Sequence, residues 1–438
     1  MARQGEHPLH VALDARLEEG RAGGLEQFII GLAHGLSRLG DGDERYSLLC
    51  WPDSTGWIAP YVAGPCRLLP TPPRESRTDR IGRLKHLCRD DLLWGPIQVP
   101  AVRLVHAACA AMDGPIKALG RAMLERSDGT IEAAGVDLMH FTKQLAFQTD
   151  VPSIYQPHDL QHLHLPQYFS PPHHFGRELV FRTFCHQARM VATVSRWVRD
   201  DLLAHYRLAP EKVCVVPYAP VLAAYAEPSA EDLAGARRRL DLPEAFLLYP
   251  AQTFPHKNHA GLLEAMALLR RRGLEVHLVC SGRKNDHYPT LQGLAERLGV
   301  GGQVQFVGFV SPMELHCLYR LCRGVVIPSK FEAASFPLWE AFLAGAACAC
   351  SNVTSLPAQA GEAAVVFDPD NTEAIAQAVA RLWTDEYLRR DLADRGSRNV
   401  ARFTWDRTAR LFRAHYRRLA GRALTDEDRD LLAAPPLL

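Results

Sequence analysis

The sequence predicts an α/β protein with two domains, each built on a parallel sheet that is covered by helices. Short apolar runs recur along the chain with stretches of helical spacing between them, and this alternation is typical of parallel strands buried on both faces. The pattern lapses between Pro217 and Phe246, where prolines and charged residues interrupt it, so we expect the domain boundary there. The runs expected as strands are Val11–Asp14, Tyr46–Cys50, Asp137–Phe141, Ser153–Gln156, Met190–Val194 and Val213–Pro217 in the first domain, and Phe246–Tyr249, Val276–Cys280, Val304–Val307, Val325–Pro328, Cys348–Ser351 and Ala364–Phe367 in the second.

This division predicts how the rest of the chain is organised. We expect a first domain over residues 1–220, with an insertion at about 65–135, and a second domain over residues 243–402. Residues 403–420 place aromatic and arginine side chains on opposite faces at helical spacing, which predicts an amphipathic C-terminal helix. Ligands of open parallel sheets bind beyond the carboxyl ends of the strands, so the expected active site is the cleft between the two domains.

Composition and charge exclude several other classes of protein. The chain has 438 residues, with 50 Lys and Arg against 49 Asp and Glu, so its charge gives no reason to expect a nucleic-acid partner. Its 11 cysteines are scattered and form no C-x-x-C pair, so we expect free thiols in a reducing compartment. No apolar leader or membrane-spanning run is visible. We therefore expect a soluble cytoplasmic protein, with peripheral contact to the inner membrane face left open.

The insertion combines basic residues with an apolar stretch, Ile97–Met112. One interpretation is an acceptor-side or membrane-docking element, because basic groups beside an apolar face suit anionic lipid. The other is an ordinary helical insertion that buries its own apolar side. The basic residues are Arg74, Arg77, Arg80, Arg83, Lys85 and Arg89.

The strongest chemical signal is the segment 328–345, PSKFEAASFPLWEAFLAG. A predicted strand runs into a loop here, and a helix is expected to start near Pro337. The loop and the helix start would offer backbone N–H groups and the positive end of the helix dipole to a phosphate. Glu332 and Glu340 are eight residues apart, and carboxylates suit the vicinal hydroxyls of a sugar or ribose.

A second signal is the segment 247–266, LLYPAQTFPHKNHAGLLEAM, which again predicts strand, turn and helix. Lys257 comes just before the expected helix, with Asn258 as its cap. A lysine in this position can neutralise a diphosphate leaving group. Taken alone, Lys257 would be interpreted as a solvated surface residue.

Together these segments resemble the retaining glycosyltransferases of family 4, the "group 1" transferases. That family has the GT-B fold, in which two Rossmann-like domains face each other across a cleft and the last helix commonly crosses back to the first domain. The resemblance runs from Leu9 to about Leu419 and thins out in the insertion. It rests on Pro255-His256-Lys257-Asn258, on Glu332 with Glu340, and on Ser351-Asn352-Val353-Thr354-Ser355-Leu356-Pro357.

The resemblance implies roles for these positions. Glu332 would bind hydroxyls of the donor sugar, Glu340 the ribose of the nucleotide, and Lys257 the diphosphate. Backbone N–H groups next to Glu332 would hold sugar and phosphate oxygens. The donor-binding residues expected there are His256, Ala333, Ala334, Ser335, Phe336 and Leu338.

In the first domain the resemblance points to two further places. Gly23 and Gly24 match the glycine loop after the first strand, where the backbone can approach a ligand closely. His158 matches a histidine that faces the reacting sugar, so the expected catalytic residues are His158, Lys257 and Glu332. A purely structural His158 remains open. A metal shared by His158 and His162 would need a helix and a third ligand, neither of which is evident, so we expect no metal.

The chain also departs from the family pattern. Ala333-Ala334-Ser335 stands where Gly-Phe-Gly is usual, His256 where Arg is usual, and Ala251 where Gly is usual. His256 is fully charged only below its pKa, so neutralisation of the leaving group is less secure, and Arg283 is a possible substitute cation.

The resemblance implies a metal- and cofactor-independent retaining transfer of a hexosyl group, mannosyl or similar. The donor would be a nucleotide-diphosphate sugar such as GDP-mannose, and the acceptor a glycan or lipid-linked sugar in polysaccharide biosynthesis. Two alternatives stay open: a non-catalytic nucleotide-sugar-binding protein, and a nucleotide-sugar epimerase of the same fold. The sequence does not identify the donor, the acceptor or the oligomeric state.

Overall fold

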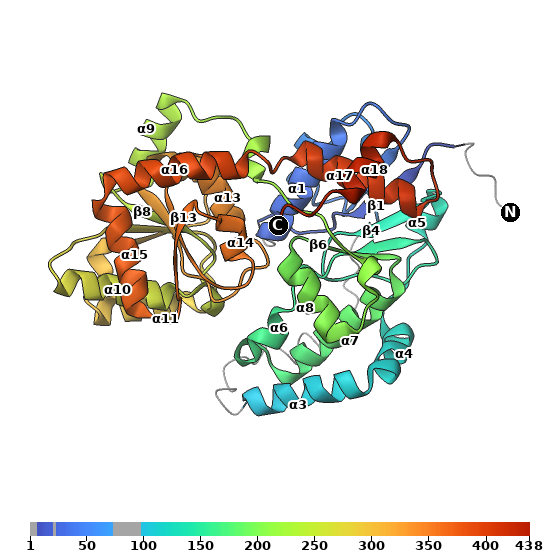
Figure 1. Cartoon of the computed structure of the whole chain (residues 1–438), viewed down its shortest axis with the longest axis horizontal. Coiled ribbons are helices and arrows are strands. Elements are labelled where there is room, and N and C mark those ends of the chain that lie inside the picture. The colour runs from blue at the N-terminus through green and yellow to red at the C-terminus, as the bar shows by residue number, and fades with distance from the viewer. Residues whose placement is uncertain (1–6, 21–22, 73–97) are drawn as a thin grey trace. The chain divides into compact units, whose positions relative to one another are not determined.

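The computed structural model describes residues 7–20, 23–72 and 98–438 (Figure 1). The described chain forms two compact units. Unit 1 comprises Met1–Tyr218 with Trp405–Leu438, and unit 2 comprises Ala219–Thr404. The six basic residues of the expected insertion, and Ile97 at the start of its apolar stretch, lie outside the described residues.

Unit 1 contains a sheet whose described strands are all parallel and follow the order β3-β2-β1-β4-β5-β6-β7. All six apolar runs expected in this part of the chain form strands, which confirms the α/β prediction. Strand β3 was not predicted; it occupies the sheet edge, and its exposed Arg67 and terminal Pro70 leave it no continuous apolar run. The strands are β1 His10–Asp14, β2 Arg45–Cys50, β3 Cys66–Pro70, β4 Leu138–Phe141, β5 Ser153–Tyr155, β6 Met190–Thr193 and β7 Val213–Val215.

Helices of unit 1 bring together segments that are distant in sequence: α17 lies along α1, and both α3 and α4 lie along α7 (Figure 1). Ser195 caps α8, since its Oγ accepts a hydrogen bond from the Val198 N–H at 3.3 Å. The helices are α1 Gly24–Ser37, α3 Gln98–Ala111, α4 Asp113–Met123, α5 Thr130–Ala133, α6 Gln161–His164, α7 Pro171–Gln187, α8 Arg196–Tyr206, α17 Trp405–Leu419 and α18 Asp426–Ala433.

Helix α17 is amphipathic, as expected, but part of its basic face is buried. Arg413 is 2% exposed and pairs with Asp41. Arg417 donates to Asp428 at 2.8 Å and also pairs with Glu44. Because buried guanidinium groups need acidic partners, these pairs fix the position of α17 within unit 1.

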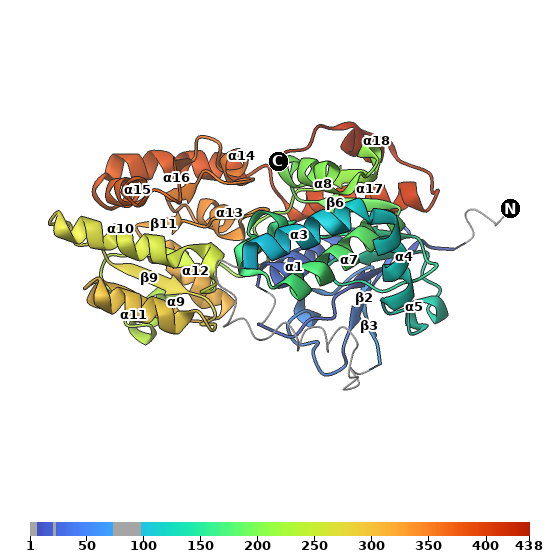
Figure 2. The ribbon, with the colours of Figure 1, turned by 90° about the horizontal axis from the view of Figure 1, so that it is seen from below.

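Unit 2 contains a second sheet of parallel strands, in the order β10-β9-β8-β11-β12-β13. All six expected runs of the second half form its strands, and Figures 1 and 2 show α16 and α11 on opposite sides of them. The strands are β8 Leu247–Pro250, β9 Leu278–Ser281, β10 Val304–Gly308, β11 Gly324–Ile327, β12 Cys348–Ser351 and β13 Ala364–Phe367. The helices are α9 Ala230–Arg239, α10 His259–Arg271, α11 Tyr288–Arg297, α12 Pro312–Leu321, α13 Phe336–Leu343, α14 Leu356–Ala360, α15 Thr372–Thr384 and α16 Glu386–Val400.

The described residues bear on two expectations from the composition: the state of the cysteines and the question of a membrane-spanning helix. The ten described cysteines are all free thiols, and eight of them are buried, which agrees with the expectation from the sequence. Among the described helices, none combines the length and the apolar character that crossing a membrane requires.

The contact between α1 and α17 gives a direct test of this packing. Gly31 of α1 faces the ring of Trp405, and a Cβ added there would lie 1.9 Å from Trp405 Cε2. We expect Gly31→Ala to lower the free energy of unfolding by about 1–3 kcal/mol, because the indole must move out of its packed position. Urea denaturation followed by tryptophan fluorescence measures this change.

Gly176→Ala is the matched control, because Gly176 lies inside α7 and an added Cβ there meets nothing within 4 Å. This variant should be unchanged or more stable by up to about 1 kcal/mol, since alanine favours helix. Equal stability of the two variants would contradict the close approach of α17 to α1.

Candidate functional site

Two loops of unit 2 leave the same edge of its sheet. Strands β8 and β11 pair in parallel, so residues 251–258, which follow β8, and residues 328–335, which follow β11, start side by side at the carboxyl edge. The backbone N–H of Lys330 donates to the carbonyl of His256 at 2.8 Å and ties the loops together. The two segments singled out in the sequence therefore meet.

At this junction Lys257 and Glu332 form an ion pair, with Lys257 Nζ 2.6 Å from Glu332 Oε1. Lys257 ends a short 3₁₀ turn, Pro255–Lys257, and its carbonyl accepts a hydrogen bond from the hydroxyl of buried Tyr249 at 2.7 Å. The Glu332 backbone N–H donates to Thr354 Oγ1 at 3.2 Å. The side chains of Lys257 and Glu332 are 23% and 11% exposed, so both are held in place and accessible to a ligand.

Asn258 occupies the N-cap position of α10, but the expectation that its side chain caps the helix is wrong. Its backbone is left-handed, with φ of 57°, and no capping hydrogen bond forms. Instead the buried side-chain amide donates to the carbonyl of Pro369 at 2.9 Å. Asparagine adopts the left-handed region more readily than most residues, so it allows the sharp turn that follows Lys257.

Glu340 lies apart from this ion pair, in the second turn of α13. Its side chain is buried, and its carboxylate accepts a hydrogen bond from the Tyr319 hydroxyl of α12 at 2.8 Å. Within the described part of the chain, no ion pair reaches Glu340. Burial raises the pKa of Glu340 to about 7, and the Tyr319 hydrogen bond offsets part of that rise. Glu340 is thus a buried acid that titrates near neutral pH.

The loop before α13 is held by Gln359. The Ser335 backbone N–H donates to Gln359 Oε1 at 2.8 Å, and Gln359 Nε2 donates to the Ser335 carbonyl at 2.7 Å. This N–H, one of those expected to bind donor oxygens, is therefore already bonded inside unit 2. The Ser335 hydroxyl is buried and finds no partner among the described residues.

The remaining expected donor-binding residues surround the start of α13 and the turn before Lys257. Ala333 and Ala334 lie half-buried in the loop, while Phe336 and Leu338 lie in the first turn of α13. The ring of His256 stacks on Phe254, with ring centroids 5.8 Å apart.

The loop after β9 borders the same turn. A Cβ at Gly282 would lie 2.6 Å from the carbonyl carbon of Ala251, so glycine is needed for this close approach. The carbonyl of Arg283 accepts a hydrogen bond from the Thr253 N–H at 3.3 Å. The backbone of Arg283 therefore lies beside the loop that carries Lys257.

In unit 1, His158 follows β5 and is held at both ring nitrogens. Nε2 lies 2.8 Å from the Thr142 carbonyl, which can only accept, so Nε2 carries the proton. Nδ1 then accepts from the Tyr218 hydroxyl at 3.1 Å. Burial lowers the pKa of His158, so the ring is neutral at neutral pH.

A chain of hydrogen bonds extends from His158 to helix α17. Gln156 Nε2 donates to the Tyr218 hydroxyl at 3.2 Å, and His140 Nε2 lies 2.7 Å from Gln156 Oε1. His140 Nδ1 lies 2.8 Å from the Tyr416 hydroxyl of α17. The amide oxygen of Gln156 can only accept a hydrogen bond, so Nε2 of His140 carries the proton. Nδ1 of His140 then accepts a hydrogen bond from the Tyr416 hydroxyl.

The other expected residues of unit 1 lie close to this histidine or point elsewhere. Gly23, with φ of 55°, immediately precedes Gly24 at the start of α1, and Phe28 of the same helix packs edge-on against the His158 ring. His162 turns away and bonds to Glu178 Oε1 at 2.9 Å. The structure therefore does not form the His158–His162 pair that the sequence analysis considered for a metal.

Tyr319 and Gln359 were missed by the sequence analysis. Each bonds to a site residue more than twenty positions away in sequence, Tyr319 to Glu340 and Gln359 to Ser335. Neither contact leaves a periodicity or a spacing signal. The burial of Glu340 inside an apolar helix, whose neighbours are all hydrophobic, could have suggested that it needs a hydroxyl partner.

Comparison with known proteins identifies the class of enzyme. Residues 22–219 match the family model described as Glycosyltransferase Family 4, and residues 235–399 match the model described as Glycosyl transferases group 1. The chain belongs to this family of GT-B glycosyltransferases, which confirms the resemblance derived from the sequence.

The relatives of this chain include two mannosyltransferases of Escherichia coli. The chain is 27% identical to O-antigen chain mannosyltransferase B of Escherichia coli over 266 residues, which are 58% of this chain and 70% of that protein. It is 32% identical to the serotype-specific mannosyltransferase WbdA of Escherichia coli over 186 residues, which are 42% of this chain but 23% of that longer protein. A solved glycosyltransferase from Rickettsia africae ESF-5 shares the fold, with a TM-score of 0.64 at 14% identity, covering 95% of this chain and 100% of that one.

The raised pKa of Glu340 predicts a pH-dependent stability. In the unfolded chain a glutamate titrates near pH ~4.3, so the folded state binds the extra proton between that pH and about 7. Stability from this group is fully present below pH ~4.3 and is lost as the pH rises through about 7, by up to about 3 kcal/mol. We expect Glu340→Gln to remove this loss in urea denaturation across that range.

The exposed Glu362→Gln variant serves as the control and should follow the wild type at every pH. If Glu340→Gln also follows the wild type, Glu340 is not an acid that titrates near neutrality.

Proposed function

We propose that the chain is a retaining glycosyltransferase. It moves a hexosyl group, mannosyl or similar, from a nucleotide-diphosphate sugar such as GDP-mannose to a glycan or lipid-linked acceptor in polysaccharide biosynthesis. The observation that carries this proposal is the accessible Lys257–Glu332 ion pair, at the sheet edge and beside the start of α13. The two mannosyltransferase relatives support a mannosyl donor.

The ion pair gives each partner a role when donor binds. The diphosphate replaces Glu332 as the anion beside Lys257, so the lysine remains neutralised and forms charge-assisted bonds. Glu332, released from Lys257, then accepts hydrogen bonds from the sugar hydroxyls. Glu340 accepts hydrogen bonds from the ribose, and its Tyr319 partner sets the direction of the carboxylate.

The chemistry in this proposal needs positioning and charge stabilisation. The acceptor hydroxyl attacks the anomeric carbon from the face that the nucleotide leaves, the bond from that carbon to the phosphate oxygen breaks, and this oxygen takes the acceptor's proton. Lys257 and the N-terminal dipole of α13 stabilise the negative charge that develops on the diphosphate. No resident metal or cofactor takes part in this scheme.

We assign the residues of unit 1 to positioning. His158 is neutral and bonded at both ring nitrogens, so it offers the edge of its ring to the sugar and does not act as a general acid. Gly23 and Gly24 open α1 without side chains, which leaves their backbone accessible to an acceptor or phosphate oxygen.

The role of Lys257 can be tested by titrating GDP and UDP into the protein in a calorimeter. We expect Lys257→Ala to weaken binding of the preferred nucleotide by about 10–100-fold, the value of a charge-assisted hydrogen bond. Lys330→Ala is the control, because Lys330 lies on the neighbouring loop, next to Glu332 in space and sequence, but pairs with exposed Asp370 at 2.6 Å. Unchanged binding by Lys257→Ala would contradict the proposed diphosphate site.

The same titration separates the two carboxylates. Glu332→Ala should bind nucleoside diphosphate as well as the wild type or better, because Lys257 loses its competing partner, while sugar transfer is lost. Glu340→Ala should bind nucleotide more weakly. Equal losses of nucleotide affinity in the two variants would contradict this division.

We also propose peripheral contact with the cytoplasmic membrane face through α3 and α4, which expose large apolar side chains. Leu104 of α3 is 72% exposed and Met123 of α4 is 42% exposed. Leu104→Glu should reduce cosedimentation with anionic liposomes severalfold, because it places a charge on the apolar face. Tyr387→Glu, at an 84% exposed residue of α16, is the control and should not change it. Equal sedimentation of all three proteins would contradict the membrane contact.

A further inference from the structure

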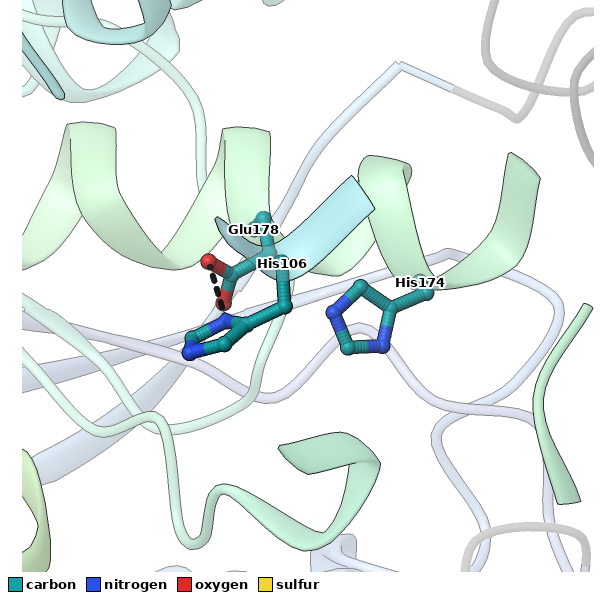
Figure 3. A group of neighbouring side chains, drawn as sticks. All are labelled: His106, His174 and Glu178. Atoms are coloured by element: carbon teal, nitrogen blue, oxygen red, sulfur yellow. Dashed lines mark ion pairs between the residues drawn. The ribbon is translucent and has the colours of Figure 1, made fainter. Parts of the chain in front are cut away.

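A cluster of ionisable side chains in unit 1 has no part in the proposed sugar transfer. His106 projects from α3, and His174 and Glu178 project from α7, four residues apart and therefore on one face of the helix (Figure 3). One ligand atom from each of the three lies within 4.8 Å of the others. Since α3 packs along α7, the cluster lies where these two helices meet.

Three of the four imidazole nitrogens in this cluster have no hydrogen-bond partner among the described residues. His174 is 1% exposed, and neither of its ring nitrogens has a hydrogen-bond partner among the described residues. In the same set of residues Nδ1 of His106 also lacks a hydrogen bond. Leaving buried polar atoms unsatisfied costs about 1–3 kcal/mol each, so three such nitrogens beside a carboxylate indicate a missing ligand.

The spacing between His106 and Glu178 fits two ligands of one metal ion better than a direct hydrogen bond. His106 Nδ1 lies 3.4 Å from Glu178 Oε2, long for a hydrogen bond between charged groups. Two ligands that each lie about 2.0–2.1 Å from a tetrahedral zinc ion are separated by roughly 3.3 Å. In Figure 3 the His174 ring points toward the ring of His106.

We propose that His106, His174 and Glu178 bind one divalent transition-metal ion of the zinc type, which fastens α3 to α7. Two imidazoles and one carboxylate are a ligand set that zinc accepts, and water completes the tetrahedron. The His106 side chain is 29% exposed, which gives the ion a path from solvent.

Neighbouring groups already orient the carboxylate. Oε1 of Glu178 accepts hydrogen bonds from His162 Nε2 at 2.9 Å and from the Tyr206 hydroxyl at 2.8 Å. Oε2 accepts one from Arg182 Nε at 2.9 Å. Asp113 pairs with Arg182 at 3.0 Å and offsets its charge. Such outer partners are typical of metal sites, because they fix the ligand before the ion arrives.

The test uses the full-length protein, stripped of metal with a chelator that is then removed. Co²⁺ is titrated while its visible d–d absorption is recorded, and Zn²⁺ affinity is measured by competition with a chromophoric chelator. We expect one equivalent per chain, an absorption spectrum of tetrahedral type, and a rise in melting temperature with Zn²⁺. His106→Ala, which changes a half-buried residue, should weaken Zn²⁺ binding by at least about tenfold, no less than the loss of an outer partner.

His164→Ala is the control, because His164 has a similarly exposed side chain on α6 and pairs with Asp201 at 2.8 Å. It should leave Zn²⁺ affinity unchanged. The proposal is overturned if no stoichiometric Zn²⁺ or Co²⁺ binding is found, if His106→Ala binds as tightly as the wild type, or if His164→Ala abolishes binding instead. Nucleotide affinity in the metal-free protein is expected to stay unchanged, so this result is independent of the donor-site proposal.

Discussion

The parallel pairing of β8 with β11 is the constraint on which the candidate site of unit 2 depends. Because both strands end at the same sheet edge, the two loops that follow them must start side by side, although their sequences are about eighty residues apart. The Lys257–Glu332 ion pair, the bond from Lys330 to His256 and the start of α13 all follow from this placement.

The energetics of the two glutamates indicate a function and not a contribution to stability. A partly exposed ion pair such as Lys257–Glu332 contributes about 0–1 kcal/mol, too little to account for two charges held at a sheet edge. Glu340 lowers the stability of the fold when it is ionised. Its carboxylate is buried with one hydroxyl partner, and this burial raises its pKa and makes ionisation costly. Perturbed acids of this kind concentrate at binding sites, where a ligand supplies the missing partners.

The sequence predicted the repeating part of the fold and the chemically distinct part of the site. Buried parallel strands leave continuous apolar runs, so twelve strands were found, while β3 was missed because an edge strand needs no such run. Motif spacing placed Lys257 and Glu332 each in a loop that follows a predicted strand. It could not show that Asn258 bonds to Pro369, or that Gln359 occupies the Ser335 N–H, because these contacts depend on three-dimensional packing. The His106 cluster was invisible for the same reason.

The most direct test of the donor site is a crystal structure of the protein with a bound nucleoside diphosphate. The account predicts that Lys257 Nζ leaves Glu332 and lies within hydrogen-bond distance of a diphosphate oxygen, with the ribose at Glu340. A diphosphate bound away from the start of α13, or one that leaves the Lys257–Glu332 ion pair intact, would contradict it.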